Sequence, residues 1–181
     1  MRLSRTDWTD AALVAMAEAG TAGVNIEQLA RNLSTTKGSF YHHFENRQAL
    51  LQAALTRWEE IVDADNQLAD QIDDPYARLI AGSVAGVGSN LNGFVDLALS
   101  SSVGDPVVAE ALARTNQLRI IWLTQAISAA GFAQPDAEER AIRGLSTYLG
   151  LYQLQRTLGE TFDQARMTAL ITSLVEDMLR A

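Results

Sequence analysis

Residues 35–44 read TTKGSFYHHF and close a longer stretch, 25–44, that decides the fold. Asn25 is a capping residue, and helical spacing relates the apolar residues that follow it. A short polar turn comes next, and then a second helical pattern that buries Phe40. Two helices joined by a short turn, the second opening on small and polar residues, are typical of a helix-turn-helix. The apolar face of the first helix consists of Ile26, Leu29, Ala30 and Leu33.

The first turn of the second helix carries the chain's only lysine, Lys37, followed by Gly38. Glycine inside a helix costs about 1 kcal/mol relative to alanine. It is favoured where another surface must come close to the backbone. The pair therefore predicts a surface that contacts another molecule, and a DNA groove is a candidate.

Composition restricts the class of protein. The chain has 181 residues, a formal net charge of −8 and no cysteine, which excludes disulfides and thiol catalysis. It has neither an apolar run long enough for a membrane span nor a secretory signal, so we expect a cytoplasmic protein. Residues 1–60 hold six basic and seven acidic side chains, whereas residues 61–181 hold eight basic and fifteen acidic ones. This step in charge predicts two parts with different partners.

The rest of the chain also reads as helix, so the predicted fold class is all-α. Each of the three prolines looks like a helix start, and capping boxes are expected at Ser4, at Asn25, at Asp136 after Pro135, and at Thr161. The expected helices are 5–20, 26–33, 36–42, 47–70, 75–91, 94–102, 106–130, 137–157 and 162–180.

Other apparent motifs are weak. Gly86-Val87-Gly88 lacks the third glycine and the preceding strand of a phosphate-binding loop. His42 and His43 are neighbours on a helix and point about 100° apart, so one metal ion cannot easily bind both. We expect no catalytic residue, no metal and no cofactor.

The segment Lys37-Gly38-Ser39-Phe40-Tyr41-His42-His43-Phe44 resembles the DNA-binding segment of the tetracycline-repressor (TetR) family. The family's next helix begins with a basic residue and leucines, as in Arg47-Gln48-Ala49-Leu50-Leu51. The turn departs from the pattern, because Ser34 and Thr35 stand where glycine and valine are common. The resemblance covers about residues 5–60, with the helix-turn-helix at about 25–44. It implies a DNA-binding domain at 1–46 and a helical effector-binding and dimerisation domain at 47–181.

The resemblance places the second helix of the motif in the major groove of double-stranded DNA. Lys37 is expected at a base edge or phosphate, Gly38 at a close approach, and hydroxyl groups at phosphates. The implied DNA-binding residues are Asn25, Thr35, Thr36, Lys37, Gly38, Ser39, Tyr41, His42, His43 and Arg47.

The acidic remainder is expected to pair two chains and to bind a small-molecule effector of unknown identity. Apolar stripes predict a dimer interface at Leu145, Leu149, Leu170, Leu174 and Met178, although these stripes could instead face the chain's own core. Candidate effector contacts are Phe94, Asn116, Arg119, Trp122, Tyr148 and Tyr152.

The resemblance thus implies a homodimeric, ligand-responsive regulator, most simply a repressor that releases a palindromic operator when helix 47–70 moves. Two alternatives remain open at this point. One is a helical protein-interaction module, and the other is a small-molecule-binding or catalytic bundle without DNA binding.

Overall fold

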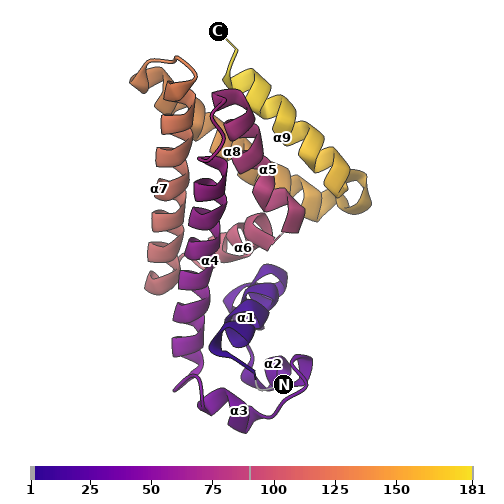
Figure 1. Cartoon of the computed structure of the whole chain (residues 1–181). Helices are drawn as coiled ribbons and strands as arrows, with labels where there is room; N and C mark the ends of the chain where they lie inside the picture. The colour runs from indigo at the N-terminus through magenta and orange to yellow at the C-terminus, as the bar shows by residue number, and fades with distance from the viewer. Residues whose placement is uncertain (1–2, 90, 181) are drawn as a thin grey trace. The chain divides into compact units, whose positions relative to one another are not determined.

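The computed structural model describes residues 3–89 and 91–180, and within these ranges it contains helices and no strand (Figure 1). The predicted all-α fold class is confirmed. The α-helices are α1 (Arg5–Ala19), α2 (Ile26–Asn32), α3 (Lys37–Tyr41), α4 (Arg47–Ala69), α5 (Pro75–Ser89), α6 (Leu91–Ser100), α7 (Pro106–Ala129), α8 (Gln134–Leu158) and α9 (Gln164–Met178). Short 3-10 helices, η1 (Gly20–Gly23) and η2 (Gly159–Phe162), follow α1 and α8.

The contacts divide the chain into two compact units. Unit 1 consists of Met1–Glu60 and Phe94–Leu112, and unit 2 of Ile61–Gly93 and Ala113–Ala181. Helices α4, α6 and α7 contribute residues to both units. The expected domain boundary between residues 46 and 47 remains a prediction.

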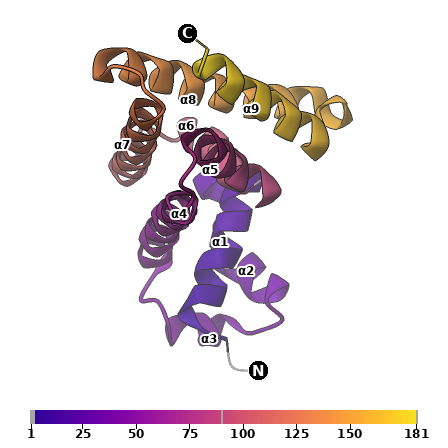
Figure 2. The same cartoon turned by 45° about the horizontal axis from the view of Figure 1, so that its top comes forward.

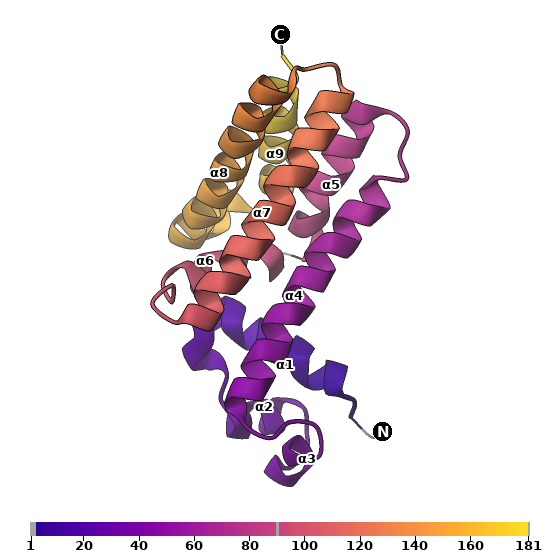
Figure 3. The same ribbon diagram turned by 90° about the vertical axis from the view of Figure 1, so that its left-hand side faces the viewer.

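Unit 1 is built on an aromatic and aliphatic core beneath the two short helices. Phe40 of α3 is fully buried, and its ring meets Trp8 of α1 edge-on at a centroid distance of 5.4 Å. Phe44 stacks on Phe40 at 5.7 Å and is 3% exposed. Leu29 and Ala30 form the buried face of α2, which packs against both α1 and α3 (Figure 3). A five-residue helix cannot hold itself together in water, so the burial of Phe40 fixes α3.

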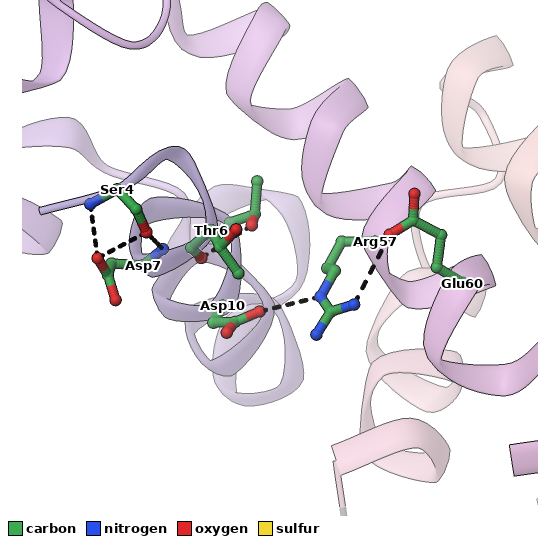
Figure 4. Close-up of polar contacts among 7 residues, drawn as sticks. Ser4, Thr6, Asp7, Asp10, Arg57 and Glu60 are labelled. Atoms are coloured by element: carbon green, nitrogen blue, oxygen red, sulfur yellow. Dashed lines mark hydrogen bonds and ion pairs between the residues drawn. The ribbon is translucent and has the colours of Figure 1, made fainter. Parts of the chain in front are cut away.

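Side-chain caps define how the helices of unit 1 begin. Ser4 and Asp7 form the predicted capping box, in which Ser4 Oγ accepts from the Asp7 amide and Asp7 Oδ2 accepts from the Ser4 amide at 2.6 Å (Figure 4). Asn25 Oδ1 accepts from the amides of Glu27 and Gln28, both at 3.0 Å. These caps satisfy amide groups that have no partner within the helix.

Two predicted helix starts in unit 2 are wrong. Helix α8 begins at Gln134, three residues before the expected start, and Asp136 lies within its first turn, where it pairs with Arg140 at 2.9 Å. Proline is tolerated in the first turn of a helix. Pro135 lies in the first turn of α8, and this helix begins without a side-chain cap. Helix α9 is capped by Asp163, whose carboxylate accepts from the Arg166 amide, and not by Thr161.

Unit 2 packs α5 and α8 against α9 around a buried cluster (Figures 1 and 2). Gly144 of α8 lies against the Met178 side chain of α9, and a methyl group at Gly144 would overlap the Met178 sulfur. Leu145 and Met178 are 7% and 6% exposed within this cluster, and Leu149 and Leu174 pack beside it. Four of the five residues expected at a dimer interface therefore serve the chain's own core, the alternative left open above, and Leu170 is half-buried.

No helix in the described ranges is both long enough and apolar enough to cross a membrane.

Candidate nucleic-acid interface and ligand cavity

Helix α3 presents a polar surface. Phe40 is its one buried residue, so the side of the helix away from Phe40 is accessible. Thr36 caps the helix by accepting from the Ser39 amide at 3.3 Å. Lys37 and Gly38 of the first turn are exposed, and Tyr41 is 54% exposed. The polar first turn and the exposed phenol thus share the accessible part of α3.

The Lys37 ammonium group is engaged within the chain. Its Nζ lies 3.1 Å from Oε1 of Glu27 on α2, and both side chains are more than half exposed. The hydrogen bond that Lys37 donates to Glu27, together with the negative charge of Glu27, raises the pKa of Lys37 above the usual value of 10.5. Lys37 is therefore a cation whose position depends on a carboxylate of the neighbouring helix.

The fold of the chain does not explain Gly38. Its φ angle is not left-handed, and among the described residues a Cβ there would meet only Thr36 Oγ1, at an ordinary 3.6 Å. The left-handed residue of the turn is Ser34, with φ +52°, a conformation that glycine adopts more readily. Glycine is thus present where the backbone does not need it and absent where the backbone favours it.

The other predicted DNA-binding residues lie around this surface. Asn25, Thr36 and His42 are exposed, whereas Thr35, Ser39 and His43 are half-buried. Asn25 and Thr36 also cap α2 and α3, so part of their polarity serves the helices themselves. Contact of these residues with DNA remains a prediction.

Arginines of unit 1 hold backbone segments in place, a role that the sequence did not suggest. Arg47 donates from Nε to the Val24 carbonyl at 2.7 Å and from its terminal nitrogen to the Thr21 carbonyl. Arg5 donates to the His43 carbonyl at 2.9 Å, with its guanidinium 4.2 Å from the centre of the Phe44 ring. Arg47 fixes the start of α4 in this way, and its contact with phosphate stays a prediction.

A further arginine connects α1 and α4. Arg57 lies 3.4 Å from the Asp10 carboxylate and 3.7 Å from that of Glu60, as Figure 4 shows. The two acidic partners balance the charge of Arg57, which leaves little net attraction for an anion at this point.

Unit 2 contains a cavity of about 70 Å³. Arg119, Trp122 and Tyr148, three of the six predicted effector contacts, line it together with the polar residues Asp65 and Asn92, which were not among the predicted contacts. Contact of these residues with an effector remains a prediction. The other lining residues are Val62, Asn66, Gly82, Ser83, Leu123, Gly144, Leu145, Ile171, Leu174, Val175 and Met178. Asn92 and Asp96 are the two polar residues of the otherwise apolar helix segment LNGFVDLAL, and a polar residue in such a segment is the signal that could have found Asn92.

Three other expected effector contacts do not line this cavity. Phe94 belongs to unit 1. Tyr152 is fully buried, meets Tyr148 edge-on at 5.0 Å, and covers Gly93, where a methyl group would overlap its ring. Asn116 is half-buried and lies outside the lining. Tyr152 thus acts as core, because an aromatic ring fills the space that a glycine leaves.

Within residues 3–89 and 91–180, no group of three or more acidic, histidine or cysteine side chains could hold a metal ion.

Comparison with known proteins gives sequence matches that cover about a third of the chain or less. Residues 9–54 match the family described as bacterial regulatory proteins, tetR family. The Transposon Tn10 TetC protein of Escherichia coli is 34% identical over 55 residues, which is 30% of this chain and 28% of that relative. The match to this curated relative therefore spans less than a third of its length. The family description, regulatory proteins, agrees with the expectation that the chain is not an enzyme.

Solved structures share the fold over nearly the whole chain. A transcriptional regulator from Rhodococcus sp. Rha1 has a TM-score of 0.81 at 20% identity, covering 98% of this chain and 96% of that one. A TetR-family transcriptional regulator from Agrobacterium tumefaciens has a TM-score of 0.79 at 18% identity, covering 96% of both chains. At this level of identity the likeness establishes the architecture.

Proposed function

We propose that this chain is a member of the family of bacterial regulatory proteins that residues 9–54 match, and that it is a ligand-responsive, homodimeric repressor that binds a palindromic operator in the cytoplasm. The observation that carries the DNA-binding part is the first turn of α3. There an exposed ammonium group stands beside a glycine that the chain's own packing does not require.

On DNA, α3 enters the major groove with Lys37 directed at guanine acceptors or an adjacent phosphate. Gly38 lets the backbone approach the duplex, because no side chain separates the two. Thr36 and Tyr41 offer hydroxyl groups to phosphates and fix the register of the helix without reading sequence. The remaining predicted contacts at Asn25, Thr35, Ser39, His42 and His43 border this surface.

A palindromic operator has two half-sites about 34–36 Å apart, and a protein with twofold symmetry can contact both at once. Two copies of the chain therefore bind as a dimer. We assign the pairing surface to the exposed face of α8 and not to the buried leucines of the same helix. Ile142, Leu154 and Leu158 are 45%, 45% and 51% exposed. Ser146 and Gly150 lie between them at four-residue spacing and are exposed too. Residues four apart lie about 40° apart round a helix, so Ser146, Gly150 and Leu154 share one face of α8, and Ile142 and Leu158 lie at its two edges.

The pattern on this face is self-complementary about Gly150. In an antiparallel pair of α8 helices related by a twofold axis at Gly150, Ser146 and Leu154 of the two copies meet on either side of the glycine. A Cβ at Gly150 meets no atom of the described residues within 4 Å, and its φ is not left-handed. Glycine in the middle of a 25-residue helix is explained by the close approach of a second helix.

The cavity of unit 2 supplies the effector site. Helix α4 carries three of its lining residues, Val62, Asp65 and Asn66, and is continuous with residues 47–60 of unit 1. A ligand that favours one position of α4 shifts the population of DNA-binding conformations by its difference in affinity for the two states.

The decisive experiment tests Lys37 on operator DNA selected from a random pool. The Lys37→Ala variant should lose specific binding in an anisotropy titration while its thermal midpoint stays nearly unchanged. Arg180→Ala removes from unit 2 an exposed cation that, like Lys37, is paired with a carboxylate, and this variant should bind as the wild type does. Operator affinity that is unaltered in Lys37→Ala rejects the assignment.

A chemical footprint gives a second readout. Lys37 is the only lysine, so an acetylating reagent modifies its side chain and the α-amino group alone. Operator DNA should slow acetylation of Lys37, and equal rates with and without the operator contradict the contact.

The dimer surface has its own test by analytical ultracentrifugation. Gly150→Leu should separate the dimer into folded monomers, since the new side chain meets nothing within its own chain. Gly104 also has open space around it, so Gly104→Leu is the matched control and should remain dimeric. A dimeric Gly150→Leu places the interface elsewhere.

A further inference from the structure

The cavity of unit 2 has a polar side and an apolar side. The polar side is formed by Asp65 of α4, Asn92 of α6 and Arg119 of α7. The apolar side consists chiefly of α8 and α9 residues, namely Leu145, Tyr148, Ile171, Leu174, Val175 and Met178. At about 70 Å³ the space is several times the roughly 10–15 Å³ that one water needs. A small molecule with one polar end and a hydrocarbon body suits such a site.

The charges of the lining cancel. Asp65 and Arg119 are its two charged residues among those that the structure describes. Arg119 is 9% exposed, so its positive charge is largely removed from water. Burial raises the pKa of Asp65, and the nearby positive charge of Arg119 opposes that effect. A charged ligand would therefore gain from one of these groups and be repelled by the other.

The hydrogen-bonding groups of the polar side include both donors and acceptors. Asn92 is 3% exposed and donates from Nδ2 to Asp65 Oδ2 at 3.3 Å. Its Oδ1 is buried and has no hydrogen-bond partner among the described residues. The Asp65 carboxylate accepts, and the Arg119 guanidinium donates. A head group that can donate and accept at once matches this arrangement.

The shape of the cavity is fixed by close contacts between its walls. Trp122 covers Gly82, where a methyl group would overlap the indole ring, and its Nε1 donates to Asp70 at 2.9 Å. On the far side, Gly144 receives Met178. A ring held by a hydrogen bond and a glycine cannot easily move aside, so the site selects ligands by size as well as by charge.

From these observations we propose that the cavity binds a neutral, compact molecule whose hydroxyl or primary amide group lies between Asp65 and Arg119 and whose hydrocarbon body lies against α8 and α9. The inference rests on the proposed function in that it takes this cavity as the effector site. A hydroxyl group donates to the Asp65 carboxylate and accepts from the Arg119 guanidinium with no unbalanced charge. A carboxylate in its place is repelled by Asp65, and an ammonium group is repelled by Arg119.

The test compares three small probes with the same three-carbon body: propan-1-ol, propanoate and propylamine. Calorimetric titration of the full chain without DNA should show propan-1-ol binding at least about tenfold more tightly than either ion, because an unbalanced buried charge costs well over 1.4 kcal/mol. Failure of propan-1-ol to bind, or tighter binding of either ion, overturns the proposal. This comparison requires no variant.

Two variants then change the order of the probes in opposite directions. Arg119→Gln leaves the carboxylate and should make propylamine the best of the three. Asp65→Asn leaves the guanidinium and should make propanoate the best. If all three proteins rank the probes alike, the probes bind elsewhere and the proposal fails. Leu174→Trp, which fills the apolar side, should weaken all three probes, and unchanged affinities in this variant also refute the site.

Operator binding is measured separately, without probes. A chain that ranks the probes as expected but does not bind the operator refutes the repressor and leaves the cavity assignment intact. A chain that binds the operator but does not bind propan-1-ol refutes the cavity assignment alone.

Discussion

Replacing Gly38 with alanine should make the free protein more stable. Gly38 is the second residue of α3, its φ is not left-handed, and a Cβ there would stand 3.6 Å from Thr36 Oγ1 without a clash. Alanine has a higher helix propensity than glycine and restricts the unfolded chain more, so the gain is about 0.5–1 kcal/mol. For a chain of this size, each kcal/mol of added stability raises the thermal midpoint by roughly 2–4 °C.

The same substitution should weaken operator binding. If the α3 backbone touches the duplex at Gly38, the added methyl group must displace DNA or tilt the helix. Overpacking a closely fitted contact typically costs about 1–3 kcal/mol, or roughly a 5- to 150-fold rise in Kd. One methyl group thus stabilises the protein and reduces its affinity for DNA.

Denaturant unfolding and operator anisotropy, measured on the same preparation, provide both numbers. Gly159→Ala is the matched control, because Gly159 has φ +59° at the end of α8 and lies far along the chain from α3. It should destabilise the protein and leave operator affinity unchanged. Unchanged operator affinity in Gly38→Ala refutes close approach, and a loss of stability refutes the claim that the fold does not require glycine at this position.

Three further outcomes follow from the structure. Glu27→Gln releases Lys37 and removes a negative charge beside α3. In a salt titration the variant should bind the operator more tightly than the wild type at each salt concentration, and weaker binding would make Glu27 a contact in its own right. Ser34→Gly should raise the free energy of unfolding by up to about 1 kcal/mol, because Ser34 occupies a left-handed conformation; a lower denaturation midpoint contradicts this reason. Burial raises the folded-state pKa of Asp65 above 3.8, so the folded chain holds this proton more tightly than the unfolded chain. Stability from this group is therefore present at low pH and lost as pH rises through the folded pKa, and the wild type should lose stability relative to Asp65→Asn as the pH rises above 3.8.

The helical architecture and the exposed polar surface of α3 could be predicted because both depend on local patterns. Asn25 caps α2 and Phe40 anchors α3, as the spacing of polar and apolar residues indicated. A buried face requires apolar side chains at the helical period, so the sequence carries that information directly. Capping is also local, and the Ser4–Asp7 box formed as expected.

Local patterns misled where several capping residues compete. Thr161 and Asp163 both precede α9, and the stronger acceptor, the Asp163 carboxylate, caps the helix. Pro135 lies within the first turn of α8, and Asp136 then pairs with Arg140. The choice depends on where the neighbouring helices end and pack, which the spacing of residues cannot specify.

Taken alone, then, the sequence determined the fold class, the helix-turn-helix and the exposure of Lys37 and Gly38, since each of these follows from side chains three or four residues apart on one helix. Tertiary structure alone decided which face of α8 is free, which aromatic residues line the cavity, and that Asp65 and Arg119 share it. Leu145 and Ile142 look alike in the sequence, but one is 7% and the other 45% exposed, because packing against other helices decides which side of an amphipathic helix is covered.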